Sequence, residues 1–276
     1  MIISKVGDKL FMVYHILYSV SHTSKFMDSL FNPTITNWIL ILIAAFIIGL
    51  GKAGLKGIDM MNVTIMAIVF GSKASTGIVL PLLCVADILA VYYYNRHAQW
   101  PQFWKLIPWM MIGILIGVYV GKDIDEVLFR KIMAVIILVT VIIIVGFEFR
   151  KTQTIPTNKL FVASTGLAAG FTTMLGNLAG AFANVYFLAM RMPKNDFIGT
   201  AAWVFLVINL FKLPFQVFYW KNITLATLQT DLLLAPALLL GFWAGLKIVA
   251  TLKDDRYRRV VIVLTVFGAM VIFFKR

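Results

Sequence analysis

The chain has 276 residues, of which 61% are hydrophobic and 13% are charged, and its mean hydropathy is +0.91. Soluble domains are closer to half apolar and carry about 25% charged residues. The composition therefore excludes a soluble fold and predicts an integral membrane protein with lipids as its surroundings. The formal net charge of +13 comes mostly from loop positions, where lipid phosphates account for it, so no nucleic-acid partner is expected.

The first 34 residues precede the long apolar runs and are predicted to form an amphipathic segment on the membrane surface. Lys5 and Lys9 are followed by a mixed stretch without a small-residue cleavage site, which is not typical of a signal peptide. An unstructured tail is the alternative interpretation.

Apolar runs then fill most of the chain. They are continuously apolar rather than alternating, and many approach the ~20 residues needed to cross a bilayer, which favours helices over barrel strands. The sequence therefore predicts an all-α polytopic membrane helix bundle. The candidate runs are 35–50, 58–71, 75–94, 103–121, 127–147, 160–175, 178–190, 197–219, 230–250 and 257–274.

An internal repeat divides these runs into two halves. A proline and two glycines of one apolar run recur 128 residues later, and an aromatic residue followed by two basic ones keeps the same shift. Earlier in each half a shift near 122 pairs Asn62 with Asn184 and Asp87 with Asn209. The first set of matched positions is Pro108, Gly113 and Gly117 with Pro236, Gly241 and Gly245.

The two predicted halves are 35–150 and 151–276, each with about five hydrophobic segments. An odd number of segments places the second half upside down in the membrane, and inverted repeats of this kind are typical of secondary transporters. The alternative is a chance likeness between apolar sequences of low complexity.

Glycines predict a helix break at the same place in each half. Residues 160–190 carry no charge, and as one helix they would be about 46 Å long, well beyond a hydrocarbon core of about 30 Å. The break is expected at Gly176 and Gly180, with Asn177 between them, and in the first half at Gly51, Gly54 and Gly57. The first two segments of each half are therefore expected to be short. Two half-helix N-termini meeting at the membrane midplane would form an anion cradle.

Charged residues inside apolar runs are costly and mark pathways or sites. Lys52 lies in the first break, and Asn209 and Lys212 share one helix face. Asp87 has two open interpretations, as the ion-pair partner of a lysine or as a proton carrier. Snorkelling of the lysines to the interface is the alternative to a site role.

Other functional classes lack their signatures. The one cysteine, Cys84, excludes intrachain disulfides and paired-cysteine metal or redox motifs. There is no HExxH, GxSxG or P-loop motif, and no histidine lies in a central run, so no enzyme activity, metal or cofactor is predicted. Asp59 and Asp231 lie near segment ends, where they are expected to be caps or interfacial residues.

Two stretches of the chain resemble the TauE/SafE sulfite exporter family. They are GLGKAGLKG with GIVLPLLCVADILAVYYYNRHAQW in the first half, and GLAAGFTTMLGNLAGAFANVYFLAM with PKNDFIGTAAWVFLVINLFKLP in the second. The resemblance covers roughly residues 38–274. Three positions depart from the family pattern: Asn95 replaces an arginine, Arg191 a glycine, and Ala181 the proline usual after Gly180.

The resemblance implies a multi-pass protein of the bacterial cytoplasmic membrane that moves sulfite, organosulfonates or a similar small anion by alternating access, with or without coupling to protons. A passive anion channel with the same pore lining is the alternative. Nothing in the sequence indicates a homo-oligomer. The positions that carry over from the family motifs are Lys52, Asp87, Thr173, Asn177, Asn209 and Lys212.

Overall fold

The computed structural model describes residues 34–122 and 158–274, with residues 124–125, 127–129, 131–132, 135, 138–139 and 142 between them. The predicted amphipathic segment lies outside this range except for its last residue. Residues 1–39 and 40–276 form separate compact units. In the first, the Thr34 hydroxyl accepts a hydrogen bond from the Asn37 amide at 3.3 Å and caps the following helix.

The described part of the chain is helical and contains no strand, which confirms the predicted all-α class. The residues described between 127 and 142 are also helical. The remaining helices are α2 (Ile35–Lys52), α3 (Asp59–Phe70), α4 (Ser72–Tyr94), η1 (Asn95–His97), α5 (Trp100–Lys122), α7 (Lys159–Gly176), α8 (Ala179–Ala189), α9 (Lys194–Pro214), η2 (Phe215–Tyr219), α10 (Leu225–Thr251) and α11 (Asp254–Phe274).

Within the described residues, five helices are long and apolar enough to cross a membrane, which confirms the polytopic bundle. They start at Ile35, Ser72, Trp100, Lys194 and Leu225. The helices α3 and α8 are apolar but have only 12 and 11 residues. By contrast, α2 and α7 have 18 residues each, longer than the half-span expected from the sequence, so only the second segment of each pair is short.

Both helix breaks lie where the glycines and Asn177 predicted them. The first spans residues 53–58, where Gly54 and Gly57 adopt φ angles of 124° and 97° that side chains rarely tolerate. In the second, Asn177 ends α7 in the left-handed conformation with φ of 55°. Gly51, Gly176 and Gly180 lie instead in the helix ends that flank the breaks.

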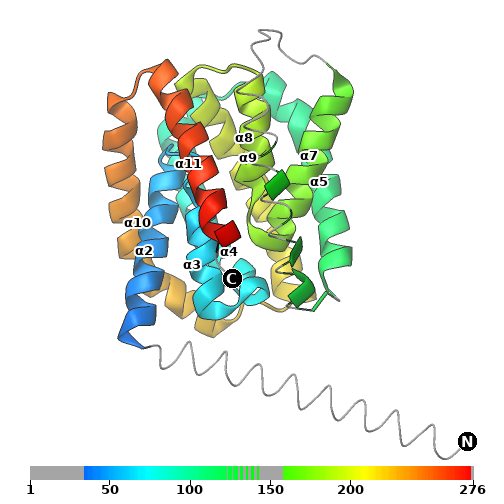
Figure 1. The fold of residues 1–276 in the computed structure, drawn as a ribbon, viewed down its shortest axis with the longest axis vertical. Coiled ribbons are helices and arrows are strands. Elements are labelled where there is room, and N and C mark those ends of the chain that lie inside the picture. The colour runs from blue at the N-terminus through cyan, green and yellow to red at the C-terminus, as the bar shows by residue number, and fades with distance from the viewer. Residues whose placement is uncertain are drawn as a thin grey trace, which may run out of the picture. The chain divides into compact units, whose positions relative to one another are not determined.

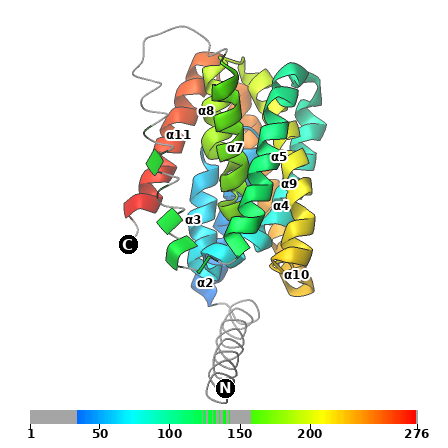
Figure 2. The same ribbon diagram turned by 90° about the vertical axis from the view of Figure 1, so that its right-hand side faces the viewer.

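Close glycine contacts join α5 to α7, which lie side by side in Figures 1 and 2, and α10 to α2, which lie side by side in Figure 1. A Cβ added to Gly113 of α5 would lie 2.2 Å from the Leu167 carbonyl oxygen of α7. One added to Gly241 of α10 would lie 2.0 Å from the Phe46 carbonyl oxygen of α2. Since the 128-residue shift pairs Gly113 with Gly241, the two helix contacts occupy equivalent positions in the repeat.

A second equivalence involves lysines at the C-terminal ends of α5 and α10. The Lys73 ammonium group donates to the carbonyl oxygens of Lys122 and Ile124. The Lys194 ammonium group donates to the carbonyl oxygens of Val249 and Leu252. Each lysine therefore caps the end of a helix whose last carbonyls have no partner within the helix.

The helices α4 and α9 pack against each other and carry the central polar residues. Asp87 of α4 and Asn209 and Lys212 of α9 are each at most 3% exposed. Both helices also approach the breaks, since Lys52 contacts Asp87 and Lys212 contacts Thr173. This arrangement brings three charged residues from three helices close to the breaks, namely Lys52 of α2, Asp87 of α4 and Lys212 of α9.

Candidate functional site

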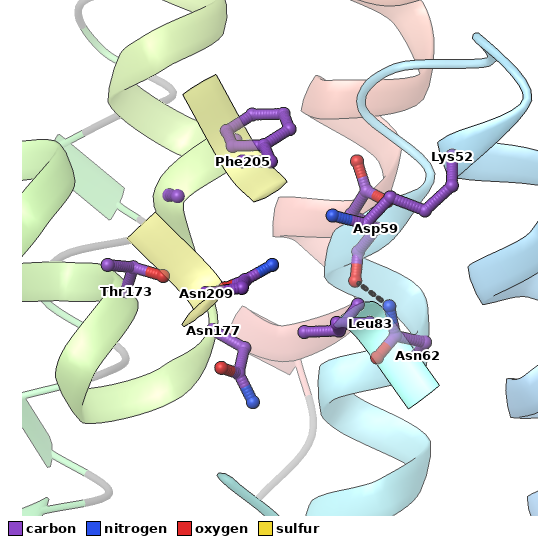
Figure 3. Close-up of a pocket in the computed structure, with 10 residues that line it drawn as sticks. Lys52, Asp59, Asn62, Leu83, Thr173, Asn177, Phe205 and Asn209 are labelled. Carbon is purple, nitrogen blue, oxygen red and sulfur yellow. Dashed lines mark hydrogen bonds between the residues drawn. The ribbon is translucent and has the colours of Figure 1, made fainter. Parts of the chain in front are cut away.

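A cavity of about 360 Å³, counting its open part, lies where the two breaks meet (Figure 3). Lys52 at the end of α2 and residues of α3 form one wall, and residues at the second break form the opposite wall. Phe205 and Asn209 of α9 lie between them. The lining residues are Lys52, Asp59, Asn62, Leu83, Thr173, Asn177, Ala179, Gly180, Phe205 and Asn209.

Four of the residues predicted for the site therefore line one cavity, namely Lys52, Thr173, Asn177 and Asn209. They come from three separate parts of the sequence and meet because the breaks of α2 and α7 approach α9. Asp87 and Lys212 are not among the lining residues. Asp87 binds Lys52 and Asn209, and Lys212 binds Thr173 and Asn177.

The carboxylate of Asp87 in α4 joins the end of α2 to α9. Its Oδ1 accepts a hydrogen bond from the Lys52 ammonium group at 2.7 Å, and its Oδ2 accepts one from the Asn209 amide at 2.6 Å. Both oxygens of this buried carboxylate are thus satisfied by short bonds. The ion pair with Lys52 neutralises a charge that would otherwise be costly inside the bundle.

The Lys212 ammonium group is bound to the end of α7. It donates to the Thr173 hydroxyl at 2.9 Å, the Thr173 carbonyl at 3.1 Å and the Asn177 side-chain oxygen at 2.7 Å. These contacts use all three of its N–H groups. A cation at a helix C-terminus is also favoured by the helix dipole, so Lys212 fixes the second break.

Asn177 links the second break to α4 as well. Its side-chain amide donates to the Thr76 carbonyl at 2.9 Å, while its oxygen accepts from Lys212. The left-handed backbone of Asn177 thus places a side chain that is bound at both ends beside the cavity. Any movement of this break must change both contacts.

The two short helices begin at the cavity. Asp59 is the first residue of α3 and Ala179 is the first residue of α8, and both line the cavity. The first amides of a helix have no partner within the helix and carry partial positive charge. Two helix N-termini with partial positive charge therefore lie at the cavity, together with Lys52 and the Asp59 carboxyl group.

Five residues of the cavity wall were missed or misjudged from the sequence, namely Asp59, Asn62, Leu83, Ala179 and Phe205. Asp59 was expected to be a cap or interfacial residue, but it lines the cavity between the breaks. Asn62 and Phe205 also line it, and the Asn62 amide is held by the Asp59 carbonyl at 2.8 Å (dashed in Figure 3). The repeat, which pairs Asn62 with Asn184, was the signal that could have pointed to Asn62.

The ammonium groups of two lysines lie close to the ring of Phe205. The Lys52 and Lys56 ammonium groups lie 4.8 Å and 5.2 Å from its centroid, within the range of a cation–π interaction. Lys56 is 1% exposed and its ammonium group has no hydrogen-bond partner. Phe205 therefore contributes electrostatic stabilisation to the lysines of the first break.

The departure from the family pattern at Ala181 has a structural counterpart. The Ala181 amide donates to the Leu178 carbonyl at 3.1 Å and closes the first turn of α8. A proline has no amide hydrogen and could not form this bond. The second break therefore has a backbone hydrogen bond that a proline at position 181 would remove.

In the described ranges, no three His, Cys, Asp or Glu side chains gather as metal ligands would. What does gather is a set of lysines, amides, a hydroxyl and two carboxylates between broken helices. The fold and the site define a polytopic helical membrane protein with a buried ionic centre between two helix breaks.

The sequence model of the sulfite exporter TauE/SafE family matches residues 31–272, nearly the whole chain. The chain belongs to this family, whose members are membrane transporters, and the resemblance stated from the motifs is confirmed. No curated protein and no solved structure matches the chain.

Proposed function

We propose that the protein is a secondary transporter that moves a small anion, such as sulfite or an organosulfonate, across the bacterial cytoplasmic membrane by alternating access. The observation that carries the proposal is the meeting of both helix breaks at one cavity beside Lys52. The family supports sulfite or a related anion as the substrate class. No catalytic role is proposed.

In this proposal the anion binds between the N-termini of α3 and α8. Lys52 supplies positive charge, and Thr173, Asn177 and Asn209 supply hydrogen bonds from the cavity wall. An anion of three or four oxygens offers enough acceptors to use these donors together with free helix amides.

We assign Asp87 and Lys212 supporting roles. Asp87 balances the charge of Lys52 and orients Asn209, because both of its oxygens are already bound. Lys212 holds the end of α7, because its three N–H groups are already used. Of the two interpretations of Asp87, this favours charge balance over proton carriage.

Alternating access would require the two halves, which we propose are residues 35–150 and 151–276, to move against each other around the cavity. The glycine contacts of α5 with α7 and of α10 with α2 each join one half to the other. Equivalent contacts on both sides of the site are what a rocking motion between inverted halves requires.

The test is uptake of radiolabelled sulfite into proteoliposomes. Lys52→Ala removes the charge on the cavity wall, and Asn177→Gly removes only a side chain, because glycine accepts the φ of 55° at this position. Both variants are expected to lose uptake while remaining folded. The exposed Lys105 provides a matched control, since Lys105→Ala should transport normally.

The outcome also separates a transporter from a passive channel. A transporter shows counterflow, in which unlabelled anion inside drives labelled anion inward against its own gradient, whereas a channel dissipates gradients only. Normal uptake by both site variants would overturn the assignment of the site.

A further inference from the structure

Asp59 places a carboxyl group beside the cavity that the proposed transport mechanism has not used. It is the first residue of α3, is half-buried, and lines the cavity. Its Oδ1 is buried and has no hydrogen-bond partner among the residues that the structure describes. This contrasts with Asp87, whose two oxygens are both bound.

The glycines of both breaks bring this carboxyl group to the centre of the site. A Cβ added to Gly51, in the last turn of α2, would lie 2.2 Å from Asp59 Oδ1. One added to Gly180, in the first turn of α8, would lie 3.6 Å from Asp59 Oδ2. The carboxyl group therefore lies between the two breaks, near the N-terminus of α8 where the anion is proposed to bind.

An ionised carboxylate at this place would repel the anion. Two like charges repel each other more strongly in a partly buried site than in water, because the effective dielectric constant is lower there. A neutral carboxyl group would instead donate a hydrogen bond. An acceptor oxygen lies on the same cavity wall, since Asn62 Oδ1 is buried and has no hydrogen-bond partner within the described ranges.

The charged and titratable groups near Asp59 come from several segments. Lys52 and Lys56 belong to the first break, Asp87 to α4 behind Lys52, and the Tyr257 hydroxyl to α11, where it donates to the Gly54 carbonyl at 2.8 Å. The helices α8 and α9 contribute only neutral groups to the cavity wall. The Lys52 charge is balanced by Asp87, whereas the Lys56 ammonium group has no hydrogen-bond partner among the described residues.

We propose that Asp59 is the proton-coupling residue of the transporter, taking up a proton when the anion binds and releasing it when the anion leaves. The inference rests on the proposed function, since it assigns a coupling ion to the same site. Binding of the two ligands is reciprocal by linkage: the anion favours the neutral carboxyl group, and a proton on Asp59 favours the anion.

A proton suits this place better than a metal cation. Two lysines, Lys52 and Lys56, lie at the same break and would repel a second cation, whereas a proton only neutralises an existing charge. In the described part of the chain, the cavity wall also offers a single carboxylate to a metal ion. The structure therefore favours proton symport over sodium symport.

The experiment counts protons taken up per anion bound. Calorimetric titrations of the purified full-length protein are made with sulfite and with ethanesulfonate, in buffers of different ionisation enthalpy. The wild-type protein is expected to take up about one proton more per anion than Asp59→Asn at neutral pH. Because the comparison is between two proteins, protons carried by sulfite itself cancel.

Asp59→Asn is expected to bind the anion, since its neutral amide copies the protonated carboxyl group. Asp231→Asn is the matched control, because Asp231 of α10 is a buried carboxylate without hydrogen-bond partners that does not line the cavity. It should keep the wild-type proton count. Should Asp59→Asn fail to fold, Asp59→Ser takes its place with the same expectation.

In proteoliposomes, an inward proton gradient should drive anion accumulation by the wild-type protein, and Asp59→Asn should lose this drive. The inference would be overturned by equal proton counts in the two proteins, by loss of anion binding in Asp59→Asn, or by accumulation driven by sodium. None of these outcomes contradicts the proposal that the wild-type protein transports an anion. If the wild-type protein binds neither anion, the proposed function fails first and the inference fails with it.

Discussion

Asp87 and Asn209, which occupy equivalent positions in the two halves, are bound directly to each other. The Asn209 amide donates to Asp87 Oδ2 at 2.6 Å across 122 residues of sequence. In the predicted inverted repeat, two equivalent positions would touch only near the axis that relates the two halves. The centre of the site is therefore asymmetric in chemistry, with a carboxylate on one side and an amide on the other, and Lys52 compensates the difference in charge.

This pairing predicts that Lys52→Met and the double variant Lys52→Met with Asp87→Asn differ in stability. The single variant leaves a buried carboxylate without its cation, which costs about 3–5 kcal/mol. The double variant removes both charges and should recover most of this loss. Both free energies of unfolding can be measured by SDS titration in mixed micelles, and anion uptake should be lost in both variants.

The contrast between stability and uptake separates the two roles of Lys52. If Lys52 served only the fold, the double variant would recover uptake together with stability. A single variant as stable as the wild-type protein would contradict the ion pair as a stabilising contact.

The glycine contacts between helices predict that Gly241→Ala is destabilising. Its Cβ would lie 2.0 Å from the Phe46 carbonyl oxygen, so α10 and α2 must separate, at a cost of about 1–3 kcal/mol or more. Gly113→Ala should behave alike, because its Cβ would lie 2.2 Å from the Leu167 carbonyl oxygen. The measurement is the midpoint of thermal unfolding in detergent.

Gly180→Ala is the matched control for this prediction. The nearest atoms to its added Cβ are 3.6 Å away, which is ordinary contact, and alanine is favoured over glycine in a helix by about 0.5–1 kcal/mol. Its unfolding midpoint should not fall. Equal losses in Gly180→Ala and Gly241→Ala would show that helix spacing is not what these glycines preserve.

Much of the fold could be predicted because the bilayer restricts it strongly. An uncharged stretch longer than the hydrocarbon core must break, and glycines in both halves showed where. The membrane thickness did not determine how many residues belong to the helix before a break and how many to the helix after it. Both α2 and α7 therefore proved longer than expected, at 18 residues.

The candidate site could be predicted only in part. Lys52, Thr173, Asn177 and Asn209 were assigned from motifs and the repeat, and they line one cavity. The partners of Lys212 could not be predicted, because α9 and the end of α7 meet only in three dimensions. Asp59 was misjudged because an acidic residue in the first turn of a helix is common for local electrostatic reasons.

The contacts of Lys212 predict that it stabilises the second break. Lys212→Met leaves three acceptor oxygens of Thr173 and Asn177 without their cation, whereas Thr173→Val removes only the hydroxyl contact. Each hydrogen bond to a charged group is worth about 1.5–3 kcal/mol, so the loss should be clearly larger in Lys212→Met. Hydrogen exchange at residues 177–180 should also become faster in this variant.

The prediction depends on Lys212→Met losing more stability than Thr173→Val. Faster exchange should be confined to the second break and the start of α8, because Lys212 contacts no residue of the first break in the described chain. Unchanged exchange in Lys212→Met would show that the break is held by its backbone alone.

The lysines that cap α5 and α10 predict equal effects at two equivalent positions. Lys73→Met removes the bonds to the carbonyls of Lys122 and Ile124, and Lys194→Met removes those to the carbonyls of Val249 and Leu252. Each change exposes helix-end carbonyls and weakens a favourable dipole interaction, at a cost of about 1–2 kcal/mol. The exposed Lys253 supplies the control, since Lys253→Met should change stability by less than about 0.5 kcal/mol. If only one of the two variants loses stability, the two helix ends are equivalent in structure but do not contribute equally to the free energy of unfolding.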